Sequence, residues 1–304
     1  MRRPHVGGAL RRAAVTSVVA GAAVVGTGAA WGVDHPAGFY YGSDSNYPEG
    51  QGRYPYTEPV TGGLYASYTG EIGTWTDWSG CTRGIALNTA AVRAVNANES
   101  RLPGIPGLSL YWFMAGPGAD PHYNAGVGEA TAWGRAQAVE VQAEYATLVA
   151  HGLASRTRYI PMMYMDIEGQ PAAGYANGWN EVVNSCGQIA HVRVISPAVD
   201  RATFNGFYTY TYTHVHTVFH PGVYSTPSFW DETFGTGPYG HIPNTYEWTA
   251  ETSTRREAPG PVGFTQGAQH AVWFGGVTVT HQAGWQWTQR GGDWDQIDAA
   301  HLPT

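Results

Sequence analysis

Two carboxylates, Asp166 and Glu168, end a short apolar stretch that begins at Ile160. The stretch has the length and composition of a strand that is buried on both faces of a parallel sheet. Because strand side chains alternate, both carboxylates and Tyr164 are expected on one face, with the two carboxylate Cα atoms about 6.5–7 Å apart. Burial and mutual repulsion raise the pKa of one group, which suits one acid and one base or charge stabiliser. A salt bridge or a helix cap at the strand end is the alternative.

Carboxylates also lie near the ends of two other predicted strands. Asp44 is close to the end of a first strand that begins at Phe39, and Asp298 ends the last strand candidate, at 296–298. Runs of β-branched and aromatic residues indicate the remaining strand candidates, at 64–68, 108–114, 223–225, 245–249, 271–274 and 284–287.

Two segments between these strands are predicted to be helices. Apolar residues fall on one face of 128–151, and Gly152 is typical of the position after a helix C-terminus. Segment 199–219 alternates tyrosine with threonine, as a strand does. Its length and a predicted turn at 220–222 favour a helix instead.

Strands that alternate with helices predict an α/β protein with a parallel sheet. About eight strands favour a TIM-like (β/α) barrel, whose last strands can be irregular, over a doubly wound sheet. The G-x-G-x-x-G motif of a dinucleotide-binding fold does not follow the first strand. In a barrel the carboxyl ends of the strands converge on one face. That face would then hold four carboxylates, Asp44, Asp166, Glu168 and Asp298.

The first thirty residues differ in composition from the rest of the chain. Four arginines and no acids accompany a run rich in Ala, Val and Gly that ends near Ala30. This is the layout of a cleaved secretory signal peptide; an uncleaved anchor is the alternative, and the pair Arg11-Arg12 permits a twin-arginine route. We therefore expect a signal peptide at 1–30 and one domain at 31–304. The domain is expected to be monomeric, secreted or held in the cell envelope, with membrane contact only through the leader.

The charge and the aromatic content limit the classes of partner. The formal charge is −7, and without the four leader arginines it is near −11, which argues against nucleic acid as a partner. The absence of lysine excludes a Schiff-base lysine and a P-loop lysine. The 12 Trp and 19 Tyr suit stacking on sugar rings, although an aromatic core is the alternative.

The cysteines and histidines suggest a disulfide and no metal site. Export and the even count predict a disulfide between Cys81 and Cys186, worth about 4–5 kcal/mol in the chain-entropy model. His216 and His220 would share a helix face as zinc ligands do, with His214 nearby, but the segment lacks the glutamate of a metalloprotease motif. No G-x-S-x-G is present to indicate a serine nucleophile. We therefore expect neither a metal nor a cofactor.

Four motifs occur along the chain in the order found in a known family. They are Tyr41-Gly-Ser-Asp44, Met165-Asp-Ile-Glu168, Gly222-Val-Tyr-Ser225 and Trp285-Gln-Trp287 before Asp298. With them the chain resembles the glycoside hydrolase family 25 barrel of the lysozyme-type muramidases, and more closely their divergent relatives, the domain of unknown function 1906 group of exported glycoside-hydrolase-like proteins. The resemblance covers about Phe39 to Leu302. It implies that Glu168 is the catalytic acid and that Asp44, Asp166 and Asp298 line its site, although Asp293 and Asp295 compete for the last place.

The resulting hypothesis is an exported glycoside hydrolase that acts on peptidoglycan or a related polysaccharide through carboxylate acid/base chemistry. Trp285 and Trp287 share one strand face and are candidate sugar contacts, although a place in the barrel core fits them equally; Trp112 and Tyr164 are further candidates. The rival hypothesis is a non-catalytic glycan-binding or envelope scaffold protein on the same barrel. In it, an arginine such as Arg135 would hold the carboxylates in salt bridges.

Overall fold

The computed structural model describes the parts of the chain that form its strands, its helices and some of their connections. Cys81, Cys186, the predicted strand at 271–274 and the predicted leader lie outside the described residues. Among the described helices, none is both long enough and apolar enough to cross a membrane. The described ranges are 39–45, 67–74, 108–150, 162–169, 177–183, 189–191, 195–215, 219–235, 246–250, 282–288 and 293–298.

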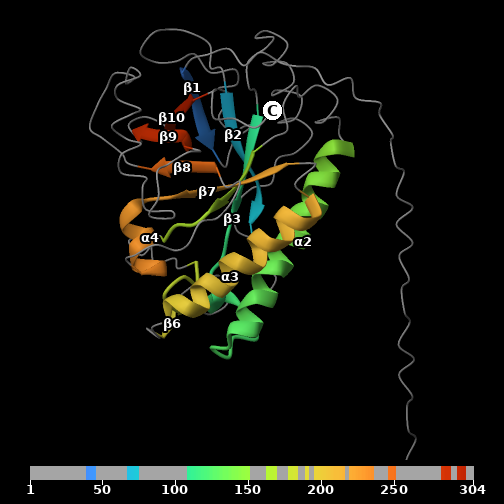
Figure 1. The fold of residues 1–304 in the computed structure, drawn as a ribbon, viewed down its shortest axis with the longest axis vertical. Helices are drawn as coiled ribbons and strands as arrows, with labels where there is room; N and C mark the ends of the chain where they lie inside the picture. The colour runs from blue at the N-terminus through green and yellow to red at the C-terminus, as the bar shows by residue number, and fades with distance from the viewer. Residues whose placement is uncertain are drawn as a thin grey trace, which may run out of the picture. The chain divides into compact units, whose positions relative to one another are not determined.

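Eight strands pair in the closed order β1-β10-β9-β8-β7-β4-β3-β2 (Figure 1). Neighbouring strands from β1 round to β9 are parallel, whereas β10 is antiparallel to both β9 and β1. A short pair, β5 and β6, lies outside this ring. The strands are β1 (Phe39–Ser45), β2 (Ser67–Thr74), β3 (Leu108–Phe113), β4 (Met162–Asp166), β5 (Val182–Val183), β6 (Ile189–His191), β7 (His220–Ser225), β8 (Tyr246–Ala250), β9 (Gln282–Thr288) and β10 (Asp293–Asp298).

Two of the longer helices directly follow the parallel strands β3 and β7, and the third lies between β4 and β7 in the chain, which confirms the predicted α/β class. The segment predicted as a helix despite its alternating tyrosines is helical, and it ends in a π-turn. The helix that follows β7 is capped by Thr226, whose Oγ1 accepts a hydrogen bond from the backbone N–H of Phe229 at 3.2 Å. The helical elements are η1 (Pro117–Ala119), α2 (Val127–Ala150), α3 (Pro197–Tyr210), η5 (Thr211–Val215) and α4 (Pro227–Phe234).

The turn predicted at 220–222 is wrong, because these residues form the first half of β7. Pro221 pairs with Met163 of β4, while pairing with β8 begins only at Gly222. Proline is tolerated near the start of a strand, where its missing N–H removes little of the ladder. A Pro-Gly pair that reads as a turn in the sequence is therefore accommodated as a strand start.

The alternation of β4 separates two packed regions. Met162 and Tyr164 belong to a cluster made only of strand residues, which we call the interior cluster. Met163 and Met165 belong to a larger core that also contains residues of α2, α3 and α4, which we call the helix-facing core. The predicted division of β4 into two faces is thus confirmed. The interior cluster consists of Tyr111, Met162, Tyr164, Tyr224, Trp248 and Ala250.

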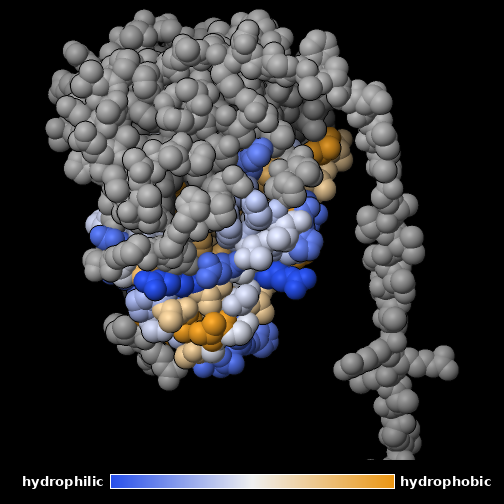
Figure 2. Space-filling view, viewed as in Figure 1, coloured by the Kyte–Doolittle hydropathy of each residue, from blue (hydrophilic) through white to orange (hydrophobic). Residues whose placement is uncertain are grey.

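Helices α2 and α3 lie side by side in close backbone contact (Figure 1). A Cβ on Gly134 of α2 would lie 1.9 Å from the carbonyl oxygen of Thr203 in α3, and a Cβ on Gly206 would lie 2.1 Å from that of Thr131. The two glycines therefore set the distance between the helices. Figure 2 shows that hydrophobic surface on this side of the described residues is confined to separate small areas.

Gly134→Ala is expected to destabilise the protein by about 1–3 kcal/mol, because the added methyl group forces the helices apart. Gly128→Ala is the matched control in the same helix, since a Cβ there meets nothing within 4 Å. Alanine at position 128 is expected to be neutral or to stabilise by up to about 1 kcal/mol through helix propensity. Denaturant unfolding of both variants measures the difference. Equal stability of the two variants would contradict the proposed close contact.

Candidate active site

The end of β4 is held by backbone hydrogen bonds to both neighbouring strands. The N–H of Met114, just past β3, donates to the carbonyl of Asp166 at 3.0 Å. On the other side, the N–H of Ile167 donates to the carbonyl of Tyr224 at 2.9 Å, and the hydroxyl of Ser225 donates to the carbonyl of Ile167 at 2.6 Å. The chain that carries the two predicted carboxylates is therefore fixed where it leaves the sheet.

Asp166 and Glu168 are brought together at this strand end but differ in environment. Asp166 is 5% exposed and pairs in register with Tyr224, whose ring belongs to the interior cluster. Glu168, two residues beyond it, is only partly buried. A buried carboxylate therefore lies beside one that solvent can reach.

Trp248 is the centre of the interior cluster. Its ring centroid lies 6.3 Å from that of Tyr111, 5.2 Å from that of Tyr164 and 4.3 Å from that of Tyr224. Its indole N–H donates to Oδ1 of Asp295 at 2.9 Å, and this carboxylate of β10 is 1% exposed. One tryptophan thus links aromatic side chains of three strands to a second buried carboxylate.

Gln286 is the residue of β9 that takes part in this interior network. It is 2% exposed, and its Oε1 accepts a hydrogen bond from the Tyr224 hydroxyl at 2.9 Å. Trp285 and Trp287 flank Gln286 in the strand, and their side chains lie outside the described residues. The sequence pattern indicated the two tryptophans as candidate sugar contacts at this place, and it gave no signal for the glutamine between them.

The direction of β10 corrects the position predicted for Asp298. Because β10 is antiparallel to β1, Asp298 pairs with Phe39, the first residue of β1, and so lies at the opposite end of the ring from the carboxyl end of β4. Asp293 instead pairs with Asp44 near the carboxyl end of β1. The signal for this reversal is the connection from β9 to β10, at 289–292, which is far shorter than the dozen or so residues of a parallel crossover.

The other predicted contacts divide between the two packed regions. Tyr164 is 1% exposed in the interior cluster, next to Trp248. Trp112 lies in the helix-facing core, where its Nε1 donates to Oε1 of Gln137 at 3.3 Å, so we leave it out of the proposed site. Arg135, a candidate partner for the carboxylates, instead has its guanidinium carbon 5.7 Å from the ring centroid of Tyr210.

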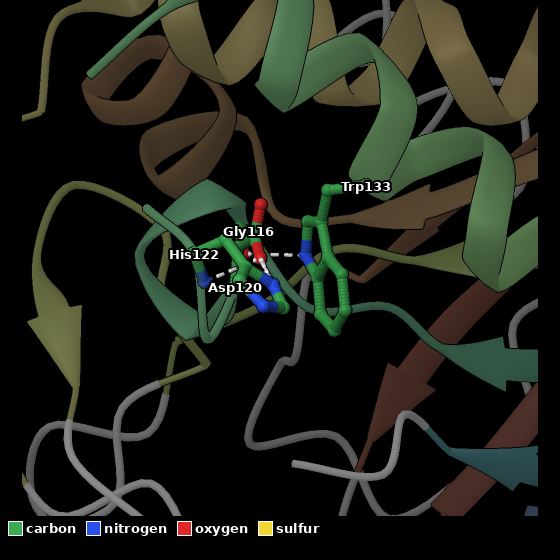
Figure 3. Close-up of polar contacts among 4 residues, drawn as sticks. All are labelled: Gly116, Asp120, His122 and Trp133. Atoms are coloured by element: carbon green, nitrogen blue, oxygen red, sulfur yellow. Dashed lines mark hydrogen bonds and ion pairs between the residues drawn. The ribbon is translucent and has the colours of Figure 1, made fainter. Parts of the chain in front are cut away.

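The connection after β3 is fastened to α2. The side-chain amide of Gln137 bonds both the N–H and the carbonyl of Ala115, each at 2.9 Å. The Trp133 indole N–H donates to the carbonyl of Gly116 at 2.9 Å (Figure 3). Farther along, Oδ1 of Asp120 accepts the N–H of His122 at 2.8 Å, and the His122 ring Nδ1 lies 3.6 Å from the same oxygen (Figure 3). This connection therefore offers a rigid support next to the end of β4.

Groups of three potential metal ligands do not occur among the described residues. His214 is exposed in the π-turn, where its ring stacks on that of Tyr210 at 4.4 Å. His220 begins β7, and His216 lies outside the described residues.

Comparisons with known proteins give one distant structural neighbour. No family model matches the chain, and no curated protein matches it. A solved structure of a glycosyl hydrolase 25 of Streptococcus pneumoniae, described as a virulence factor that participates in host cell invasion, is similar with a TM-score of 0.41 and 12% identity. The similarity covers 85% of this chain and 86% of that one.

Away from the strand ends, α3 contains a buried carboxyl group. Asp200, in the first turn of the helix, is 0% exposed. Burial raises the pKa of Asp200 to about 8 from the ordinary 3.8, although the nearby backbone N–H of Asn180 lowers it in part. The carboxyl group is therefore neutral in the folded protein at pH 7, where it would be ionised in the unfolded chain.

Asp200 is expected to make the protein less stable as the pH rises. Between about pH 4 and pH 8 the folded state keeps a proton that the unfolded state has lost, so the free energy of unfolding falls by about 1.4 kcal/mol per pH unit. Above this window both states are ionised and the loss stops. Asp200→Asn removes this contribution, so its stability relative to wild type should increase across the window. Denaturant unfolding at a series of pH values tests this, and parallel curves for the two proteins would contradict it.

Proposed function

We propose that this chain is an exported glycoside hydrolase that acts on cell-wall peptidoglycan or a related glycan. The observation that carries the proposal is the end of β4, where buried Asp166 and partly exposed Glu168 follow one another on a backbone fixed from both sides. Two carboxylates in unlike environments are what acid-catalysed cleavage of a glycosidic bond requires.

In this proposal Glu168 donates a proton to the glycosidic oxygen, because it is the member of the pair that solvent, and hence a substrate, can reach. Asp166 stays behind it and stabilises positive charge at the sugar carbon, or orients an N-acetyl group of the substrate. Asp44, near the end of β1, is the third member of the proposed site.

The register of β10 changes which late aspartates belong to the site. Asp293, paired with Asp44, and Asp295, hydrogen-bonded to Trp248, replace Asp298 in the proposal. Asp295 is a second buried carboxyl group in the interior that Asp166 borders. Tyr164 and Trp248 are the aromatic side chains of this region that the proposal includes.

The proposal extends to the family and to the location of the protein. The closed ring of strands supports a TIM-like (β/α) barrel, from which the antiparallel last strand departs. The motifs favour the glycoside hydrolase 25 kind of barrel and, within it, the domain of unknown function 1906 group. Residues 1–30 would direct export, and 31–304 would act as a monomer without metal or cofactor. Trp285 and Trp287 remain candidates for glycan contact.

Glu168→Gln is expected to reduce glycan turnover on the order of 10²–10⁴-fold, because the amide keeps the shape but lacks the transferable proton. Asp166→Asn should also slow turnover through loss of charge stabilisation. Asp298→Asn is the matched control, since its position is at the far end of the ring. Mass analysis of fragments released from peptidoglycan and other polysaccharides measures turnover by the four proteins.

Wild-type turnover that survives Glu168→Gln, or that is lost in Asp298→Asn with folding intact, would contradict the assignment. Binding without turnover by the wild type on every glycan would favour the non-catalytic glycan-binding protein instead.

Export is also expected to oxidise Cys81 and Cys186 to a disulfide. Thiol labelling of the unreduced, denatured protein purified from the culture medium should therefore find no free thiol. Reduction before labelling is the control and should expose both cysteines. Two labelled cysteines without reduction would disprove the disulfide.

A further inference from the structure

Glu168 lies just past the hydrogen-bonded ladder of β4, and its carbonyl is bonded by a distant side chain. The carbonyls of Asp166 and Ile167 are bonded by Met114 and Ser225, which follow or end the neighbouring strands. The carbonyl of Glu168 instead accepts a hydrogen bond from Nδ2 of Asn177, nine residues farther along the chain. The backbone of the proposed acid is thus held by an amide side chain.

Asn177 is itself fixed in place. It is 2% exposed, and its backbone carbonyl accepts the N–H of Gly116 at 2.7 Å. The next residue, Gly178, has a φ of +75°, and its carbonyl accepts the N–H of Gly118 at 2.9 Å. A Cβ at position 178 would lie 2.3 Å from the backbone nitrogen of Ala119, so only glycine allows this approach.

The following two residues extend the same support. The Trp179 indole N–H donates to the carbonyl of Met114 at 3.0 Å, and Met114 is also the residue whose N–H bonds Asp166. The side-chain amide of Asn180 donates to the hydroxyl of Thr233 in α4 at 3.1 Å. The segment 177–180 is therefore bonded to the residues after β3 and to α4. Through the Asn177 side chain it supports the backbone of Glu168.

We propose that Asn177 is a positioning residue that sets the place of the Glu168 carboxyl group by fixing its backbone carbonyl; the role of Glu168 rests on the function proposed above. Asn177 is bonded to the residues that follow β3, and Met114, which also follows β3, bonds Asp166. The positions of Glu168 and Asp166 therefore depend on the same strand. The two carboxylates then keep a constant separation, on which the course of glycoside hydrolysis depends.

The chemistry of the amide makes the proposal testable. Only an N–H or O–H donor can bond the carbonyl of Glu168. In Asn177→Asp an ionised carboxylate would repel that carbonyl, whereas a protonated carboxyl could donate to it and restore the contact. Because position 177 is buried, the introduced carboxyl group is expected to have a raised pKa, as Asp200 has, and to ionise only at alkaline pH. Activity of this variant should therefore be low at alkaline pH and recover as the pH falls, whereas Asn177→Ala, which has no donor at any pH, should show no recovery.

Asn124→Asp is the matched control. Asn124 lies in the connection before α2, and its Oδ1 accepts the N–H of Gly126 at 2.7 Å. An aspartate keeps this acceptor, so the same substitution should leave activity unchanged at every pH. Because the activity of the wild type can itself depend on pH, each variant is compared with wild type at the same pH.

We expect kcat to fall about 10–10²-fold in Asn177→Ala at every pH and in Asn177→Asp at alkaline pH, the scale of a small misplacement of a catalytic group, with KM little changed. Recovery toward wild type at low pH in Asn177→Asp alone supports the proposal. Wild-type kcat in both variants, or equal pH profiles for them, would overturn it. If the aspartate variant does not fold, the alanine variant alone tests the proposal: a reduced kcat supports it and a wild-type kcat overturns it.

Hydrogen exchange separates this proposal from the proposed function. The amide of Ile167, bonded to Tyr224, reports opening of the strand end whether or not the wild type has activity. If no glycan is cleaved, faster exchange in peptide 162–169 of Asn177→Ala, with unchanged exchange in Asn124→Asp, supports the positioning role while the proposed acid chemistry fails. Unchanged exchange in all three variants overturns the positioning role.

Discussion

When a parallel strand ends inside a protein, its last peptide groups need hydrogen-bond partners, because an unbonded buried carbonyl or amide costs about 1–3 kcal/mol. At the end of β4 the end of β3 bonds the carbonyl of Asp166, the end of β7 bonds both the N–H and the carbonyl of Ile167, and Asn177 bonds the carbonyl of Glu168. The positions of Asp166 and Glu168 are therefore set by backbone hydrogen bonds, and their carboxyl groups are not needed to fix the chain. The other features of the proposed site depend on this arrangement.

The same strand joins two regions with opposite chemistry. Its odd-numbered residues, such as Met163 and Met165, pack with the helices in an apolar core. Its even-numbered residues, from Met162 to Asp166, enter an interior that becomes more polar toward the carboxyl end. The helix-facing core therefore holds the sheet rigid, while the interior can carry buried polar groups whose partners are other side chains, as Trp248 and Asp295 show.

Much of this could be predicted from patterns that are local in the sequence. The buried run of β4, the helical face of α2 and the length of α3 follow from side-chain periodicity. The direction of β10 and the pairing of Pro221 could not be read in the same way, because they depend on which strands become neighbours. Asn177 was missed for a further reason: a lone asparagine in a loop has no pattern, and its importance comes from a contact made only in the folded chain.

The reversed last strand also affects how the chain can be rearranged. Because Phe39 and Asp298 are paired, the first and last described strand residues lie side by side, at the end of the ring away from Glu168. A short linker across this pair would join the two ends without crossing the carboxyl end of β4. The protein is therefore suited to circular permutation, with new termini opened in a surface connection, and to attachment to a solid support at this end, with the carboxyl end of β4 away from the support.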